Sequence, residues 1–291
     1  MAIKYLAGNR IIGTAAERLA MTTGDTLGSD GNVTNTGTAA LDTTNQKLGT
    51  GGLDFDGSDY LDCNSLLTND AMTTTGTISF WFKPDVVSGR YLWSVGDTNG
   101  TDARIYMEQQ AANKWVVYCE QGGNPQWKVD STVSTFSAGT WYHIVITHAG
   151  GSSYGTVKLW INGVDRSTNS NNGTTWNKWT DMNGLDNMFF GFASFNNNTG
   201  YGKADGLFDD IGIWNRALSS TEVGNLYNSG TGALCSTISS GLRAYYNCDS
   251  ATTNNNAEFT YPNLTNGTLF EESDTGKHYI WNGTSWNEMG P

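Results

Sequence analysis

Much of the sequence consists of short runs in which apolar and polar residues alternate. In the run 76–84, for example, Ile78, Phe80 and Phe82 occupy every second position. A period of two places alternate side chains on opposite faces of the backbone, as in a β-strand. Comparable runs, separated by turn residues, lie at 91–95, 104–107, 114–118, 141–147, 157–162 and 187–195. Short strands at this spacing, without a helical period, predict an antiparallel β-sandwich.

One segment, residues 207–230, turns from a strand into a helix. Ser219 stands three residues before Glu222. This is the spacing of a capping box, in which each of the two side chains binds a free backbone amide of the first helical turn. Gly230 is suited to the left-handed residue that ends a helix. The pattern predicts one short helix at 219–229.

This strand-and-helix segment resembles the closing signature of laminin-G-like, or concanavalin-A-like, jelly-roll domains. Four further runs stand in the order found in that family, at 53–61, 76–84, 141–147 and 157–164. The resemblance implies an all-β fold, a concanavalin-A-like jelly-roll β-sandwich of the lectin/glucanase superfamily. We expect this domain to cover residues 23–232 and to follow an N-terminal arm formed by residues 1–22.

The remaining residues, 233–291, are expected to form a C-terminal β-appendage. The run 241–250 resembles the phrase that opens a laminin-G-like domain, so it either supplies a strand that completes the sandwich or starts a truncated repeat. Within 277–289, the pair Asn282-Gly283 separates two runs that carry aromatic residues, which predicts a small β-hairpin. The hairpin resembles a module found at the ends of bacteriophage structural proteins, and this resemblance implies a virion protein.

The charge of the chain limits its partners. Its 291 residues carry a formal net charge of −12 at pH 7. Nucleic acid or an anionic membrane would require a basic patch, so we expect neither as a partner. No run approaches the ~18 consecutive apolar residues of a membrane span, and the first residues lack the apolar run of a signal peptide. We therefore expect synthesis in a host cytoplasm and a place on the virion surface, with an extracellular protein as the alternative.

Four cysteines, Cys63, Cys119, Cys235 and Cys248, show no Cys-x-x-Cys spacing and therefore no zinc motif. Cys235 and Cys248 flank a short segment and could pair in oxidising surroundings. The alternative is that both are free, buried thiols.

Catalysis is not expected from the sequence. Retaining glycoside hydrolases need two facing carboxylates about 5–5.5 Å apart. On one strand they come from a phrase such as Glu-x-Asp-x-x-Glu, which does not occur here. The three histidines, His143, His148 and His278, have no Gly-x-Ser-x-Gly motif to serve.

The resemblance also implies a structural calcium ion near the edge of the sandwich, because an aspartate pair at the last strand often contributes to such a site. The matching positions here are Asp209 and Asp210, and Asp25 and Asp30 lie in loops that would supply further oxygens. The alternative is that Asp209 and Asp210 cap a turn or accept hydrogen bonds from backbone amides.

Two segments combine tryptophan with hydrogen-bonding side chains, as a sugar site requires. The first, residues 171–181, contains Trp176 and Trp179 together with Asn172 and Asp181. The second contains Trp127, after the Gly- and Asn-rich residues 122–124. These residues are our glycan-binding candidates. The alternative is that the tryptophans fold back onto the sandwich or pack against a neighbouring subunit.

Together these features predict a non-catalytic virion surface protein, either a capsid decoration or a component of a tail or fibre. Its lectin-like sandwich would recognise a glycan or a host surface with loops at the rim. Other virion proteins, further copies of the same chain in a homo-oligomer, and cell-surface glycans are the expected partners. The alternative is a stand-alone carbohydrate-binding module or adhesin. A glycoside hydrolase would rest on analogy of fold alone.

Overall fold

A computed structural model describes most of the chain. The described residues are 4–6, 10–13, 32–36, 39–68, 75–87, 89–98, 103–110, 114–132, 136–150, 156–170, 182, 184–195, 198–238, 240–249, 255–256, 267–282 and 285–290. They form two compact units. Asp30–Ala257 is the sandwich unit, whereas Met1–Ser29 and Glu258–Pro291 together make the terminal unit.

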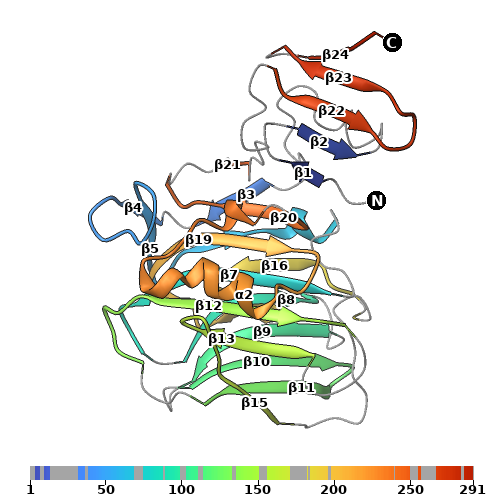
Figure 1. Ribbon diagram of the computed structural model, residues 1–291. Helices are drawn as coiled ribbons and strands as arrows, with labels where there is room; N and C mark the ends of the chain where they lie inside the picture. Colours follow the sequence, from blue (N-terminus) through green and yellow to red (C-terminus); the bar gives the residue numbers. More distant parts are fainter. Residues whose placement is uncertain are drawn as a thin grey trace. The chain divides into compact units, whose positions relative to one another are not determined.

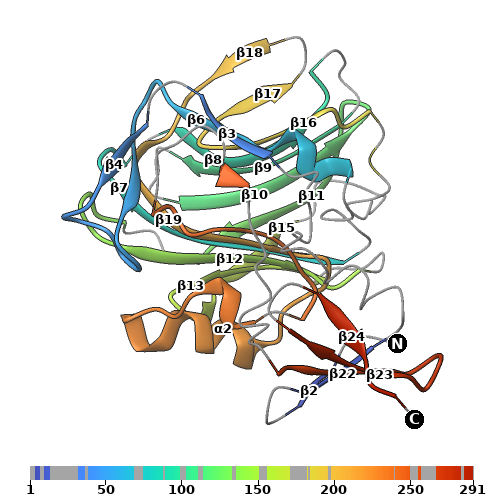
Figure 2. The same cartoon turned by 90° about the horizontal axis from the view of Figure 1, so that it is seen from above.

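The sandwich unit is built from two facing sheets of mainly antiparallel strands (Figures 1 and 2). The first has nine strands, in the spatial order β15 (Ser167–Ser170), β11 (Asn124–Ser131), β10 (Lys114–Gln121), β9 (Ala103–Gln110), β8 (Arg90–Gly96), β16 (Asn187–Phe190), β6 (Tyr60–Asp62), β3 (Asn32–Thr36) and β21 (Asn255–Asn256). The second has eight strands: β14 (Val164–Asp165), β13 (Val157–Ile161), β12 (Tyr142–His148), β7 (Gly76–Pro84), β19 (Asp205–Trp214), β5 (Gly52–Asp56) and β4 (Ala40–Asp42), with β20 (Leu242–Tyr246) paired to β19. This arrangement confirms the expected all-β sandwich.

The core lies between the two sheets and contains the apolar half of each alternating run. On β7, Ile78, Phe80 and Phe82 are completely buried. Phe80 reaches across to Phe190 of the opposite sheet, with 5.7 Å between ring centroids. Burying a large apolar side chain stabilises the fold by roughly 1.5–3 kcal/mol. The strand pattern read from the sequence is thus the pattern of core packing.

Helix α2 (Ser220–Tyr227) lies on the outer side of the eight-stranded sheet (Figure 2). It begins with the predicted capping box: the Ser219 hydroxyl accepts from the Glu222 amide, and the Glu222 carboxylate accepts from the Ser219 amide. The helix ends earlier than expected, because Asn228 already adopts the left-handed conformation at φ 45°. The short 3-10 helix η3 (Asn228–Gly230) follows. Among the described residues α2 is the single α-helix.

The sandwich unit also contains a short hairpin and two further 3-10 helices. The hairpin β17 (Ala193–Phe195) and β18 (Asn198–Tyr201) lies on the outer side of the nine-stranded sheet (Figure 2). The 3-10 helix η1 (Asn64–Thr68) follows β6, and the 3-10 helix η4 (Cys235–Thr237) precedes β20.

No helix among the described residues is long and apolar enough to span a membrane.

The run 241–250 completes the sandwich rather than starting a repeat. Its strand β20 pairs antiparallel with the second half of β19, with Ile211 opposite Tyr246. The first half of β19 pairs with β5 along the same edge. The strand that follows the helix therefore fills the part of this edge that β5 leaves open.

The terminal unit is a five-stranded sheet in the order β1 (Lys4–Leu6), β2 (Arg10–Gly13), β22 (Leu269–Glu272), β23 (His278–Trp281) and β24 (Trp286–Glu288). The expected hairpin is present as β23 and β24, and its Trp281 and Trp286 pack together, with Phe270 of β22 against Trp286. Because β2 pairs in parallel with β22, the N-terminal residues share a sheet with the C-terminal ones. This grouping differs from the division into an arm at 1–22 and an appendage at 233–291.

Candidate functional site

Strands β9 and β10 carry a group of partly buried aromatic and charged side chains on the outer side of the nine-stranded sheet. Along β9, buried and partly exposed residues alternate, so that Ile105 points into the core whereas Arg104 and Tyr106 point outward. The register sets outward residues side by side: Tyr106 is opposite Tyr118, and Arg104 is opposite Glu120. We call these four residues the β9–β10 patch.

The rings of the patch form a continuous aromatic surface. The centroids of Tyr106 and Tyr118 lie 5.3 Å apart. On the other side Tyr106 stacks on Phe195 of β17, at 5.6 Å and an interplanar angle of 17°. Tyr91 of β8 meets Tyr106 edge to face at 5.1 Å. The hairpin β17–β18 therefore supports one side of the aromatic surface and fixes its rings in place.

A charged pair borders these rings. Arg104 Nη2 lies 2.6 Å from Glu120 Oε2, and the Tyr118 hydroxyl donates to the same carboxylate oxygen at 3.0 Å. The side chains of Arg104 and Glu120 remain 20% and 10% exposed, so solvent still reaches both. Burial, and then the hydrogen bond to Glu120, raise the pKa of Tyr118 to about 12. The phenol thus remains a neutral donor at physiological pH.

A second charged pair lies on the neighbouring strand β11. Lys128 is opposite Tyr118 in the register, and its ammonium lies 3.0 Å from a carboxylate oxygen of Asp130. The face thus combines flat aromatic rings with positively and negatively charged groups that can form hydrogen bonds. Such a surface can contact the apolar C–H face of a sugar ring while the charged groups bind its hydroxyls.

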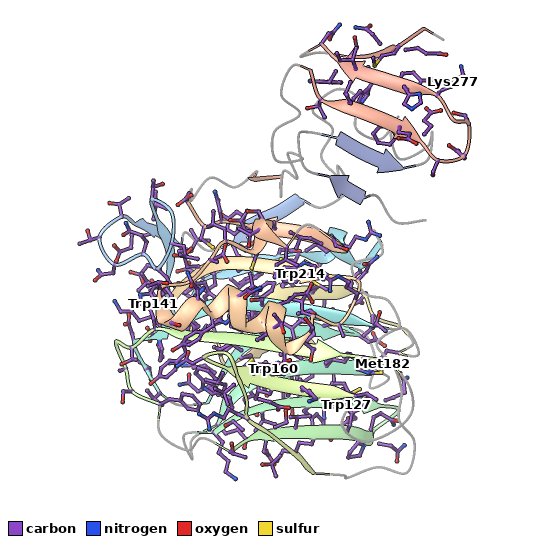
Figure 3. The ribbon with its side chains drawn as sticks, viewed as in Figure 1. Trp127, Trp141, Trp160, Met182, Trp214 and Lys277 are labelled. Atoms are coloured by element: carbon purple, nitrogen blue, oxygen red, sulfur yellow. The ribbon has the colours of Figure 1, made fainter. Side chains whose placement is uncertain are left out.

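The structure does not support Trp127 as a glycan-binding residue. Trp127 lies on β11 next to outward-facing Lys128, and its own side chain points into the core, where it is 0% exposed (Figure 3). Alternation along the strand is the physical reason, because neighbouring side chains take opposite faces. The other candidates, Trp176, Trp179, Asn172 and Asp181, lie outside the described residues. The β9–β10 patch was missed, although the alternation of 104, 106, 118 and 120 with apolar neighbours was a signal for it.

Asp209 and Asp210 both face the outer side of the eight-stranded sheet because β19 contains a β-bulge. The register with β7 shifts between Asp209 and Gly212, and Asp210 takes a left-handed φ of 50°. Asp209 Oδ2 accepts hydrogen bonds from the backbone amides of Lys47 and Leu48, at 2.7 and 2.8 Å. Burial raises the pKa of Asp209 to about 7 and that of Asp210 to about 6.

Backbone amides donate hydrogen bonds to both members of this aspartate pair. Amide N–H groups approach Asp209 Oδ2, and both oxygens of Asp210 accept the amide of Cys235. The described part of the chain holds no group of three or more His, Cys, Asp or Glu residues that could bind a metal. The pair therefore matches the alternative, amide binding. Asp25 and Asp30 lie outside the described residues, so a calcium site that includes them stays a prediction.

Cys235 and Cys248 are both free and buried. Cys248 belongs to the core cluster between the sheets. The Cys235 thiol instead donates to the carbonyl of Asp210, at 3.3 Å, beside η4. The structure thus selects the second alternative given above for these two residues.

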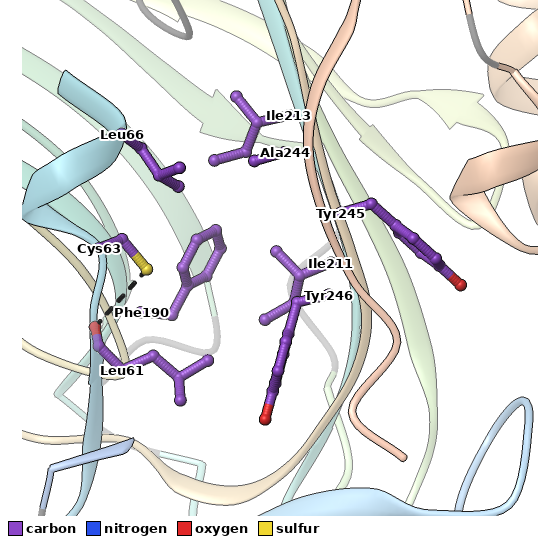
Figure 4. Close-up of a pocket in the computed structure, with 9 residues that line it drawn as sticks. All are labelled: Leu61, Cys63, Leu66, Phe190, Ile211, Ile213, Ala244, Tyr245 and Tyr246. Carbon is purple, nitrogen blue, oxygen red and sulfur yellow. Dashed lines mark hydrogen bonds between the residues drawn. The ribbon is translucent and has the colours of Figure 1, made fainter. Parts of the chain in front are cut away.

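Two further features of the sandwich carry no candidate chemistry. Ser79 and His143 form a hydrogen bond of 3.0 Å, but both are at most 1% exposed. An apolar cavity between the sheets is lined by Leu61, Phe190, Ile213 and neighbouring residues, with no polar surface toward it (Figure 4). Apolar cavities of this kind remain dry. Both features belong to the packing of the sandwich.

The two facing sheets and the outer helix define a lectin-type β-sandwich. A family model described as the concanavalin A-like lectin/glucanases superfamily matches residues 55–224, more than half of the chain, and the protein belongs to this superfamily. No curated protein matches the sequence significantly.

Several solved structures are similar to the chain. Domain 4 of AbnA, a GH43 extracellular arabinanase from Geobacillus stearothermophilus solved with arabinotriose, is 20% identical, over 67% of this chain and 86% of that one, with a TM-score of 0.49. The CBM40 of the Ruminococcus gnavus IT-sialidase, bound to α2,3 sialyllactose, is 17% identical, over 59% and 94%, with a TM-score of 0.46. A heptameric SAP-like pentraxin from Limulus polyphemus is 14% identical, over 61% and 81%, with a TM-score of 0.39.

Proposed function

We propose that this protein is a non-catalytic carbohydrate-binding protein and that its sugar site is the β9–β10 patch. The observation that carries the proposal is the placement of Tyr106 and Tyr118 beside the Arg104–Glu120 pair. The two rings are held by neighbouring aromatics, so little conformational entropy is lost when a ligand binds. The chain belongs to the concanavalin A-like lectin/glucanases superfamily, and its sandwich supplies a rigid scaffold for this surface.

The proposal is tested by screening the purified chain against a glycan array. Tyr118→Ala removes an aromatic platform and should weaken retention of any bound glycan by roughly tenfold or more, as expected for loss of an interface anchor. Trp141→Ala is the matched control. This tryptophan lies beside β12 in the other half of the sandwich, where its indole donates to the carbonyl of Asn45. Equal loss in both variants, or no binding by the unaltered protein, would contradict the proposal.

Two earlier predictions enter the same experiment as separate arms. The loop of Trp176 and Trp179 remains an alternative sugar site, and the double variant Trp176→Ala, Trp179→Ala should leave binding intact if the β9–β10 patch is the site. Running the array with calcium and with EDTA tests the predicted calcium dependence. Glycan binding that persists in EDTA would show that the sugar site does not require calcium.

We also propose a place on the surface of a virion, in a capsid decoration, tail or fibre. The supporting observation is the terminal unit, in which both chain ends share one small sheet that is distinct from the sandwich. Such a unit can attach a lectin-like domain to other virion proteins or to further copies of the chain. Labelling of purified particles with an antibody against the sandwich tests this place, and particles that lack the protein would contradict it.

A further inference from the structure

We propose that Glu120 makes the β9–β10 patch select neutral, hydroxyl-rich sugars over sugars that carry a carboxylate. Glu120 would do so by occupying the guanidinium of Arg104, the group that a carboxylate on a sugar would otherwise bind. This inference rests on the proposed function, because it concerns the specificity of the same site. It assigns to Glu120 the role of a specificity-determining residue.

The first argument is the geometry of the pair. Arg104 and Glu120 are opposite each other on β9 and β10, and their charged atoms are 2.6 Å apart. Arginine binds carboxylates best through two parallel N–H···O bonds from its planar fork. With Glu120 already on Nη2, a second carboxylate would bring two negative charges against one guanidinium. Like charges at such a distance disfavour each other strongly where burial limits screening by water.

The second argument is the hydrogen bonding of Glu120 itself. The Tyr118 hydroxyl donates to the same oxygen that binds Arg104. The carboxylate is therefore held by both an aromatic residue of the patch and its cation. Its side chain is only 10% exposed, so a ligand does not displace it easily into solvent.

The third argument is the charge of the surroundings. A cation on the neighbouring strand, Lys128, is paired with Asp130. Glu108, two residues after Tyr106, adds a further carboxylate on the same side of the sheet and accepts from Gln110 at 3.2 Å. Sugar hydroxyls both donate and accept, so they can join these pairs without separating them. An anionic sugar would instead compete with Glu120 and Asp130 for their two cations and would meet the further carboxylate of Glu108, on a chain whose net charge is −12.

The test compares two single substitutions, each of which removes one negative charge from the same face. Glu120→Gln keeps the shape of the side chain but removes the carboxylate that binds Arg104. Glu108→Gln makes the same change of charge and leaves the Arg104–Glu120 pair in place. Affinities are measured by calorimetry at constant ionic strength, for neutral oligosaccharides retained on the array and for analogues of them that carry a uronic or sialic acid. Melting temperatures establish that both variants fold.

We expect the unaltered protein to bind the neutral oligosaccharide at least tenfold more tightly than its acidic analogue. Glu120→Gln should gain tenfold or more in affinity for the acidic analogue, and Glu108→Gln should not. The double variant Arg104→Gln, Glu120→Gln should lose this gain, because it depends on the guanidinium of Arg104.

Each other outcome counts against the inference. Equal gains in Glu120→Gln and Glu108→Gln would show that only net charge matters. Tight binding of acidic sugars by the unaltered protein, abolished by Tyr118→Ala, would overturn the selectivity while the proposed sugar site stands, and this result needs no variant of Glu120. Failure of every sugar to bind would overturn the proposed function and this inference together.

Discussion

At the scale of single residues, the bulge at Asp210 determines how the outer side of the eight-stranded sheet is stabilised. The extra residue turns both Asp209 and Asp210 toward the segments that cover the sheet. Asp209 binds the amides at Lys47 and Leu48, while the Lys47 ammonium lies 4.3 Å above the ring of Trp81. The left-handed φ at Asp210 costs on the order of 1 kcal/mol. The hydrogen bonds that the two carboxyls accept from backbone amides offset this cost.

The raised pKa of Asp209 makes stability depend on pH. In the unfolded chain this carboxyl titrates near 3.8, but in the fold it titrates at about 7 because it is buried. The unfolded state therefore releases its proton first, and the stabilising effect of the protonated form is lost as pH rises from about 4 through 7. The change is at most about 1.4 kcal/mol per pH unit for one carboxyl.

Asp209→Asn should therefore flatten the fall in stability between pH 4 and 7 and leave the protein more stable than the unaltered chain at pH 8. Urea unfolding at a series of pH values measures this. Asp249→Asn is the control, since Asp249 also accepts a hydrogen bond from a backbone amide, that of Gly51 at 2.9 Å, but is less buried than Asp209. An unchanged pH profile for Asp209→Asn would contradict the account, and Asp210, whose pKa is also raised by burial, would then carry the dependence.

At the scale of elements, α2 depends on its N-terminal cap. Arg216 binds Glu222, and this contact holds the pKa of Glu222 at about 2, so the carboxylate that accepts the Ser219 amide is always charged near neutral pH. Ser219→Ala should lower the free energy of unfolding by about 1 kcal/mol. Ser220→Ala, the next residue, is exposed and should change it little. Chemical denaturation distinguishes the two, and equal effects would argue against the cap.

The elements show what the sequence could and could not predict. The strands and α2 could be predicted because alternation and the capping box are local patterns in the sequence. In the structure, the alternating apolar residues form the core and the capping box begins the helix. The β9–β10 patch was not recognised, because its residues become neighbours only through the register between strands. Trp127 was misplaced for the converse reason: its polar neighbours in sequence suggested a loop, whereas strand alternation buries it.

At the scale of the whole molecule, the sequence did not reveal that the two chain ends belong together. The parallel pairing of β2 with β22 joins segments more than 250 residues apart, and no local pattern encodes such a contact. The entry and exit of the sandwich are likewise joined at long range. Strands β3 and β21 are antiparallel neighbours, with Asn32 opposite Asn256. The chain therefore enters and leaves the sandwich at one place, as an insertion into the terminal unit would require.

If the sandwich is such an insertion, residues 30–257 should fold without the terminal unit. The fragment retains both sheets, α2 and the β3–β21 pair that brings its ends together. We expect a single cooperative thermal transition and glycan affinities within about twofold of the full chain, because every residue of the β9–β10 patch lies inside the fragment. Circular dichroism and calorimetry measure these properties, with the full chain as reference. Loss of assembly by a folded fragment would assign attachment to the terminal unit, whereas an unfolded fragment would show that the sandwich depends on the strands at the chain ends.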